Sequence, residues 1–296
     1  MPAKEKRIHL NWYTARVKRL IINADDFGLA PGVNRAIVEL QQAGVLTSAT
    51  LMATGAYFSP AVYLAFAQPA LAVGCHITLI DGLPVLRTVE VPSLLERGRL
   101  RTSVSGFVRD LMRGRIREKE IEAEATAQIQ RIQSSGITVS HIDSHKHLHA
   151  FPGVLRPLLR AAQACQVKRV RNPFEPLWSL GATRGGGGMR RAQVHLMRSQ
   201  RRTFLKLTAE HGMLTTDGAM GVLATGSLDD AILAKLLNAM PPGTWELVCH
   251  PGYRDRALEE AHTRLLTSRD VERTALLEAV PAARAGFDLI DFHQLG

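Results

Sequence analysis

The sequence predicts an α/β protein whose single domain is an irregular (β/α) TIM-like barrel. Short apolar segments alternate with amphipathic helical ones along the chain, which is typical of repeated strand–helix units and a parallel sheet. Polar residues recur at or near the carboxyl ends of the expected strands: Asp25 and Asp26, His76, His145, Arg171 and His250. In a barrel these ends meet on one face, where active sites are built, whereas an open sheet would spread them over a wider crevice.

In chain order, the expected strands are residues 20–22, 47–54, 71–79, 139–143, 167–171, 245–250 and 287–292. The helix after the first strand illustrates how the helices are identified. Pro31 can occupy its first turn, and Gly44 gives its stop signal. One face of this helix would carry the apolar residues Val33, Ile37 and Leu40.

The remaining helices depend on caps and on apolar periodicity. Ser59 is expected to cap a short helix, and Ser227 a helix that contains Ile232, Leu236 and Leu237. The other expected helices span residues 121–132, with a stop at Gly136, and residues 154–165, 190–207 and 271–280.

One barrel domain is expected at residues 19–296, after an N-terminal extension at residues 1–18 that we expect to be flexible. A basic helical insertion is expected at about residues 176–215. The run Gly185–Gly188 inside it indicates a flexible loop, because four glycines bury nothing and order poorly.

The cysteines and the N-terminus indicate a reducing, cytoplasmic setting. Cys75, Cys165 and Cys249 lack CxxC spacing, so neither a disulfide framework nor a thiolate metal site is expected. The first 18 residues contain no apolar core of signal-peptide length. No run approaches the roughly 18 apolar residues that a membrane-spanning helix requires.

The net charge of +10 raises the question of anionic partners. Much of this charge lies at residues 97–117 and 184–206, which solvated helix faces explain as well as a surface for anionic lipid or nucleic acid. In residues 190–207 basic side chains are interleaved with apolar ones, so peripheral contact with an anionic membrane is a hypothesis. With aromatic residues at 5% and no recognition motif, no nucleic-acid partner is expected.

Asp25 and Asp26 are unusual at the end of a strand, because adjacent carboxylates repel and strands disfavour Asp. A helix-capping Asp beside a surface Asp would explain the pair without any function. The apolar strand before the pair and Phe27-Gly28 after it favour a place at the barrel mouth instead. There a metal would relieve the repulsion by binding one carboxylate and leaving the other free as a base.

Histidines supply the other candidate ligands. His76 lies alone in an apolar strand, where a buried core histidine is the usual alternative. Residues 141–149 contain four histidines, which packing alone explains poorly, although a chance surface cluster is an alternative. His145, at the turn, is the first choice as a ligand, while His149 and His147 are assigned to the substrate or to support of the ligands.

One carboxylate and two imidazoles would leave positions open for water and substrate. This set favours Zn²⁺ and also allows Mg²⁺ or another divalent transition metal. His250 ends another strand before Pro251-Gly252 and is a candidate general acid, or a plain turn histidine. Arg171 is a candidate to orient the base or hold a sugar hydroxyl, and a surface arginine is the alternative.

At these residues the sequence resembles the YdjC-like (ChbG-type) carbohydrate deacetylases. The resemblance is carried by Asn23-Ala24-Asp25-Asp26-Phe27-Gly28, by Gly74 to Leu79, by His141 to His149 and by Cys249-His250-Pro251, in the expected order. It implies an irregular βα barrel and one divalent metal bound by Asp26, His76 and His145. It also implies that Asp25 is the general base and His250 the acid.

The chain length, Asn172 to Pro176 and the basic insertion resemble the hopanoid-biosynthesis-associated branch, HpnK. That branch implies removal of acetyl from an N-acetylglucosaminyl hopanoid lipid, by an enzyme that is cytoplasmic or peripheral to the inner membrane. A deacetylase of soluble chito-oligosaccharides is the alternative of the same class. A metallo-phosphoesterase is disfavoured because no second carboxylate-rich cluster is found. A catalytically silent barrel that binds lipid or nucleic acid is the alternative of another class.

Overall fold

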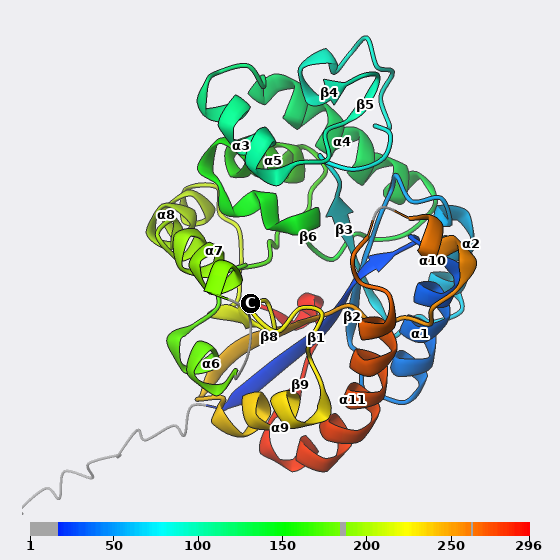
Figure 1. Cartoon of the computed structure of the whole chain (residues 1–296), viewed down its shortest axis with the longest axis vertical. Helices are drawn as coiled ribbons and strands as arrows, with labels where there is room; N and C mark the ends of the chain where they lie inside the picture. The colour runs from blue at the N-terminus through cyan, green and yellow to red at the C-terminus, as the bar shows by residue number, and fades with distance from the viewer. Residues whose placement is uncertain (1–16, 184–187, 262) are drawn as a thin grey trace, which may run out of the picture.

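The computed structural model describes residues 17–183, 188–261 and 263–296. Its centre is a curled, parallel sheet in the order β6-β3-β2-β1-β8-β7, with β9 paired to β1, and helices cover its outer side (Figure 1). The strands are β1 Lys18–Phe27, β2 Ser48–Leu51, β3 Ala72–Ile77, β4 Leu95–Glu96, β5 Arg99–Leu100, β6 Ile142–Ser144, β7 Gly218–Met220, β8 Gly243–Cys249 and β9 Asp288–Leu289. This arrangement confirms the predicted barrel-like α/β class.

The helices follow the strands around the sheet. They are α1 Pro31–Gln42, α2 Phe58–Phe66, α3 Val104–Met112, α4 Glu118–Ser134, α5 Pro152–Ala164, α6 Leu177–Ala182, α7 Gly188–Arg198, α8 Arg201–Glu210, α9 Asp230–Ala239, α10 Arg256–Glu260 and α11 Thr267–Ala283. Four 3₁₀ turns are η1 Pro92–Leu94, η2 His145–Ala150, η3 Arg284–Gly286 and η4 Phe292–Gln294. In Figure 1, α3, α4 and α5 gather at the top, while α9, α11 and α1 follow the lower and right sides.

β1 is the central strand, and its last eight residues are all buried. A strand buried on both faces needs a near-continuous apolar run, which explains why Leu20–Ile22 marks it in the sequence. β2 pairs with β1 only from Asn23 onward, while β9 pairs with Arg19 and Leu20 on the same side. Two short strands therefore share one edge of β1, and the predicted strand 287–292 is shortened to β9.

The ring between β6 and β7 is completed by extended backbone rather than by a strand of regular length. Val170 bridges Ile142 of β6, and Arg169 bridges Leu214. Further on, the Ala219 N–H of β7 donates to the Phe174 carbonyl at 3.4 Å. The predicted strand 167–171 is thus reduced to isolated bridges, and the barrel is irregular at this side.

Two predicted helix caps are wrong. α2 begins at Phe58 with Tyr57 at the N-cap position, so Ser59 lies inside the helix. α9 is capped by Asp229, whose carboxylate accepts from the Ile232 N–H at 2.8 Å, whereas the Ser227 hydroxyl donates to the Ala224 carbonyl. Asp and Ser cap helices about equally well, so residue type alone does not distinguish Ser227 from Asp229. The cap is the residue directly before the first helical residue, Asp230, and is therefore Asp229.

The single helix expected at 190–207 is wrong: this segment lies in two helices, α7 and α8, which are separated at Ser199-Gln200. Val194, Phe204 and Leu207 are buried in the core, whereas Leu196 is 67% exposed. The alternation of apolar and basic residues here therefore largely reflects packing against the barrel. Of the expected flexible extension at 1–18, residues 1–16 lie outside the described residues, but Lys18 begins β1, so the extension is shorter than predicted. Gly185 to Gly187 also lie outside the described residues, while Gly188 begins α7.

All three cysteines are buried, and none is part of a disulfide among the described residues. Among the described residues, none of the helices is both long and apolar enough to cross a bilayer. The sequence did not predict β7, the β4–β5 hairpin, α3, α6 or α10.

Candidate active site

A bulge at the end of β1 explains how two adjacent carboxylates reach the same site. Ala24 pairs with Ala49 of β2 and Phe27 pairs with Leu51, so β1 has one residue more than β2 in this interval. Asp26 adopts a left-handed backbone conformation, with φ of 68°. In a regular strand neighbouring side chains point to opposite faces, and a bulge re-aims one of them.

Asp26, His76 and His145 form a compact triangle. His76 Nε2 lies 3.5 Å and His145 Nδ1 3.4 Å from Asp26 Oδ1, and the two nitrogens are 3.3 Å apart. Ligands of a tetrahedral ion at ~2.0–2.1 Å would be separated by about 3.3 Å. Asp26 Oδ1 is buried and has no hydrogen-bond partner among the described residues. The three side chains therefore fit one divalent metal ion.

A carboxylate stands beside the far nitrogen of each histidine of this triangle. Asp143 Oδ1 lies 2.7 Å from His76 Nδ1, and Asp81 Oδ2 lies 3.5 Å from His145 Nε2. Such partners fix the ring orientation and the tautomer of histidines that bind metals. His76 thus offers Nε2 and His145 offers Nδ1 to the same point.

The turn after His145 has a strained backbone. Lys146 and His147 have φ of 54° and 55°, two consecutive residues in the left-handed region that side chains other than glycine disfavour. Lys146 Nζ donates to Asp81 Oδ2 at 2.6 Å, which connects this turn to the loop after β3. This ion pair helps to maintain the strained turn and, with it, the position of His145 directly after β6.

Asp25 faces a different set of partners. Arg171 donates to both of its carboxylate oxygens, at 2.7 and 2.9 Å, and Asn23 donates to Oδ1 at 3.0 Å. Burial opposes ionisation, yet Arg171 and His76 hold the pKa of Asp25 well below its usual value. Asp25 is therefore a buried carboxylate that stays ionised.

Arg171 is completely buried, so its interpretation as a surface arginine is wrong. Besides Asp25 it contacts Asp143, and its Nε donates to Glu246 at 2.7 Å. Asp25, His76 and Asp143 also come close enough to hold an ion, but the Arg171 guanidinium binds both of those carboxylates. This second cluster is thus an ion-pair network around the Arg171 guanidinium, which takes the place that a metal cation would have.

His250 lies across from Asp25, with Nε2 3.8 Å from Asp25 Oδ2. Glu272 of α11 accepts from the His250 backbone N–H at 2.6 Å and lies 3.9 Å from its Nδ1. Burial lowers the pKa of His250 to about 4, although Asp25 opposes this change. His250 is therefore neutral near pH 7 and close enough to Asp25 to share a proton after a small movement.

The other histidines of residues 141–149 have separate surroundings. His141 is buried and stacks on Phe292, with ring centroids 3.5 Å apart. His149 Nδ1 lies 2.7 Å from Ser144 Oγ, and burial lowers its pKa well below the usual value. Burial also lowers the pKa of His147 to about 3. Neither His147 nor His149 belongs to the triangle.

Several buried groups of the site were not assigned from the sequence: Thr50, Asp143, Glu246, Arg269 and Glu272. Glu246 had a usable signal, since it interrupts the apolar strand that precedes His250. Arg269 and Glu272 lie in a helix with other charged residues, where nothing in the sequence distinguishes a buried charge from an exposed one.

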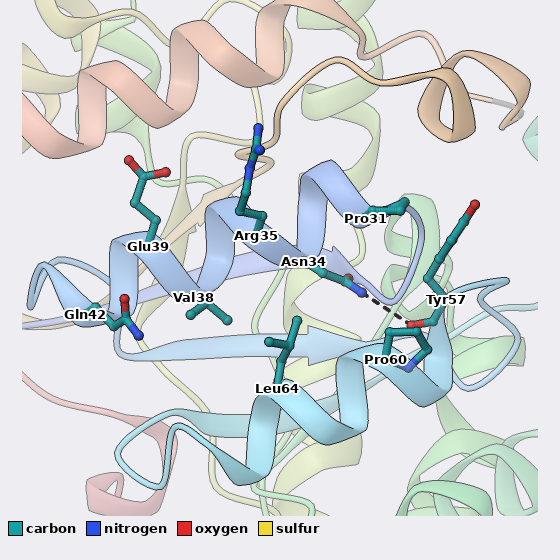
Figure 2. Close-up of a pocket in the computed structure, with 9 residues that line it drawn as sticks. All are labelled: Pro31, Asn34, Arg35, Val38, Glu39, Gln42, Tyr57, Pro60 and Leu64. Atoms are coloured by element: carbon teal, nitrogen blue, oxygen red, sulfur yellow. Dashed lines mark hydrogen bonds between the residues drawn. The ribbon is translucent and has the colours of Figure 1, made fainter.

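A separate groove of about 500 Å³ lies between α1 and α2, on the outside of the barrel (Figure 2). Its lining residues are Pro31, Asn34, Arg35, Val38, Glu39, Gln42, Tyr57, Pro60 and Leu64. The Asn34 amide donates to the Tyr57 carbonyl across its end. The groove includes no member of the Asp–His triangle, so it is distinct from the candidate active site.

A barrel-like α/β fold with an Asp–His cluster at its strand ends defines the structural class of this chain. The family model described as YdjC-like protein matches residues 19–283, so the chain belongs to the YdjC-like protein family. This confirms the family part of the predicted resemblance.

Curated relatives carry the name carbohydrate deacetylase. One from Geobacillus stearothermophilus is 40% identical over 280 residues, covering 93% of this chain and 96% of the relative. One from Mus musculus is 31% identical, covering 79% of this chain and 78% of the relative. One from Brevibacillus brevis is 43% identical over 157 residues, so this match spans 60% of that relative.

Solved structures resemble the whole chain. A crystal structure from Enterococcus faecalis, described as a candidate cellobiose-phosphate cleavage protein, has a TM-score of 0.75 and 28% identity. The match covers 93% of this chain and 98% of that one. A lactam utilization protein from Thermus thermophilus, with a TM-score of 0.51 and 16% identity, shares the fold alone.

Proposed function

We propose that the chain is a metal-dependent hydrolase that removes the acetyl group from N-acetylated carbohydrates. The observation that carries this proposal is the Asp26–His76–His145 triangle beside an ionised Asp25 and a neutral His250. The near full-length similarity to a relative named carbohydrate deacetylase supports the substrate class.

Asp26, His76 and His145 would hold the ion. A bound divalent metal supplies Lewis acidity at the acetyl carbonyl and lowers the pKa of water. A carboxylate with one open oxygen and two imidazoles suits Zn²⁺ and other transition metals better than Mg²⁺, which prefers oxygen ligands.

Asp25 would act as the general base. A water that attacks the acetyl carbonyl carbon gives its proton to Asp25 as the C–O bond forms. The ion pair with Arg171 keeps Asp25 ionised before this step and fixes both of its oxygens. The low pKa that Arg171 imposes also means that Asp25 releases the proton readily.

His250 would deliver the proton to the leaving group. Burial lowers its pKa and keeps it neutral at rest, and its Nε2 lies 3.8 Å from Asp25 Oδ2, so it is placed to take the proton from Asp25. Glu272 holds the His250 backbone, which keeps Nε2 directed at Asp25. When the C–N bond breaks, His250 gives the proton to the amine nitrogen, and acetate and the free amine result.

The test combines elemental analysis of the purified protein with acetate release from N-acetylated sugars. We expect about one divalent metal per chain, and acetate release that stops on chelation and returns with Zn²⁺ or Co²⁺. A protein that holds no metal, or one that releases no acetate from any N-acetylated mono- or disaccharide or glycolipid, would contradict the proposal.

The acceptor is proposed more finely as an N-acetylglucosaminyl hopanoid lipid. The exposed Arg202 and Lys206 of α8 support contact with anionic headgroups, and the exposed Leu196 of α7 adds an apolar group. The other large apolar residues at positions 190–207 are at least partly buried, so membrane contact would be mainly electrostatic; they are Val194, Met197, Phe204, Leu205 and Leu207. Acetate release from a glycolipid compared with N-acetylchitobiose separates this acceptor from soluble chito-oligosaccharides. Sedimentation with liposomes that is independent of anionic lipid would contradict the membrane contact.

A further inference from the structure

α11 reaches the site with two charged residues one turn apart. Arg269 Nη2 donates to Asp26 Oδ2 at 2.5 Å, and Glu272 accepts from the His250 N–H. Residues at this spacing share one face of a helix, and both side chains are 1% exposed. Residue 269 lies 243 positions from Asp26, so this contact joins the end of the chain to its first strand.

The contact divides the two oxygens of Asp26 between different tasks. Oδ2 is occupied by Arg269, while Oδ1 faces His76 and His145 without a hydrogen-bond partner among the described residues. A free carboxylate can bind an ion with either oxygen or with both. Because Arg269 occupies Oδ2, Asp26 presents only Oδ1 to an ion, and in one orientation.

Arg269 is itself fixed on several sides. Its Nε donates to the Leu265 carbonyl at 3.0 Å, and its own carbonyl accepts from the Gly252 N–H at 3.2 Å. A Cβ at Gly252 would approach Arg269 Cδ to 3.0 Å, so the loop after His250 packs directly on this side chain. The guanidinium therefore has little freedom to follow Asp26 if the carboxylate turns.

Asp26 has a particular need for such a restraint. Its backbone is left-handed, a conformation that residues with a Cβ adopt less readily than glycine, and it lies at a bulge instead of in a regular ladder. The backbone alone therefore does not hold the side chain. An anchor at Oδ2 from a separate helix fixes the carboxylate relative to the two histidines.

We propose that Arg269 is a positioning residue that presents Asp26 Oδ1 to the metal and aligns this ligand with His250 through their shared contact with α11. This inference rests on the metal site of the proposed function. Arg269 does not touch the reacting atoms in this assignment, so its effect acts through Asp26.

The test measures metal dissociation constants for the full chain, with Zn²⁺ by competition with a chelating dye and with Co²⁺ by its absorption spectrum. Supporting groups of metal ligands typically change affinity by 10- to 100-fold. We expect Arg269→Gln to raise the dissociation constant by about that factor and to change the Co²⁺ spectrum. At saturating metal most of the kcat should return.

Arg273→Gln is the matched control. Arg273 is on the same helix, one turn further, and pairs with Glu39 and Asp270 at 3.0 Å near the surface. It has no contact with the triangle among the described residues. Its loss should leave the metal dissociation constant within about twofold of the parent.

Arg269→Lys keeps the charge and one donor and provides a milder variant if the Gln variant fails to fold. It should bind metal more weakly than the parent and more tightly than Arg269→Gln. A parent-like dissociation constant in either folded Arg269 variant would overturn the inference. If the parent itself binds no metal, the proposed function fails first, which distinguishes the two outcomes.

Discussion

Arg171 binds Asp25 through both of its terminal nitrogens in an ion pair that is sealed from solvent, with N–O distances of 2.9 and 2.7 Å. The same guanidinium contacts Asp143 and Glu246, so one cation serves three carboxylates. Asp25 and Glu246 come from neighbouring strands of the barrel, β1 and β8, and Asp143 from β6. The site and the stability of the barrel therefore depend on the same residue.

Replacement of Arg171 by Met should destabilise the fold strongly. Removal of one partner from a buried ion pair typically costs about 3–5 kcal/mol, because an uncompensated charge remains. Here three carboxylates would lose their cation. We expect the free energy of unfolding in urea at pH 7 to fall by about this amount.

Arg256→Met is the control for that experiment. Arg256 pairs with Glu260 at 2.8 Å, but its side chain is 90% exposed, and exposed pairs contribute only about 0–1 kcal/mol. Equal losses in the Arg171 and Arg256 variants would show that burial of the network has no special weight.

Asp25→Asn should separate metal binding from turnover. The amide keeps the shape of the side chain but cannot accept the proton of water, and loss of a general base typically costs about 100- to 10,000-fold. We expect kcat for acetate release to fall within that range. Asp25 is not in the triangle, so the bound metal measured by elemental analysis should stay near the parent value. A variant that keeps its kcat would contradict the role of Asp25 as base.

The fold was largely predictable because the longer strands of the sheet, β1, β3 and β8, contain buried apolar runs. β1 and α1 were located from Leu20–Ile22 and from the spacing of Val33, Ile37 and Leu40, all of which are fully buried. The segment 167–171 was less predictable, since its apolar residues form isolated bridges rather than a ladder. Local composition does not indicate how many residues of a segment will pair with neighbouring strands.

The candidate site was predictable where its residues end strands. Asp25, Asp26, His76, His145, Arg171 and His250 were identified from that position, and the structure brings them together. Arg269 and Glu272 could not be identified, because their partners are more than 20 residues away and nothing in α11 differs from an ordinary charged helix. The bulge that turns Asp26 was also missed, since its sequence contains neither Gly nor Pro.

His145→Ala should abolish tight metal binding. It removes one corner of the triangle, in which Nδ1 lies 3.4 Å from Asp26 Oδ1 and 3.3 Å from His76 Nε2. The two remaining ligands would hold an ion weakly, so dialysed protein should contain well under one metal per chain. His195→Ala, at an exposed histidine of α7, is the control. Full metal occupancy in the His145 variant would remove His145 from the ligand set.

The stability of the metal-free chain should fall as pH falls from about 6.5 to 4, partly because of His250. Burial lowers the pKa of this histidine from 6.5 to about 4 in the folded chain, so the unfolded chain binds its proton first. The stabilising contribution is complete above pH 6.5 and is lost progressively down to pH 4. A pKa shift of this size corresponds to a change of about 3 kcal/mol in the free energy of unfolding.

His250→Asn should lack that part of the pH dependence. Between pH 7 and pH 4, its free energy of unfolding should therefore decrease by about 3 kcal/mol less than that of the parent, measured in urea with a chelator present. The chelator matters because metal binding depends on pH and would otherwise add its own contribution to the free energy of unfolding. His195→Asn, at an exposed site, should follow the parent curve. Parallel curves for the parent and His250→Asn would mean that His250 is not buried in its neutral form, and the proposed proton transfer from Asp25 would lose its basis.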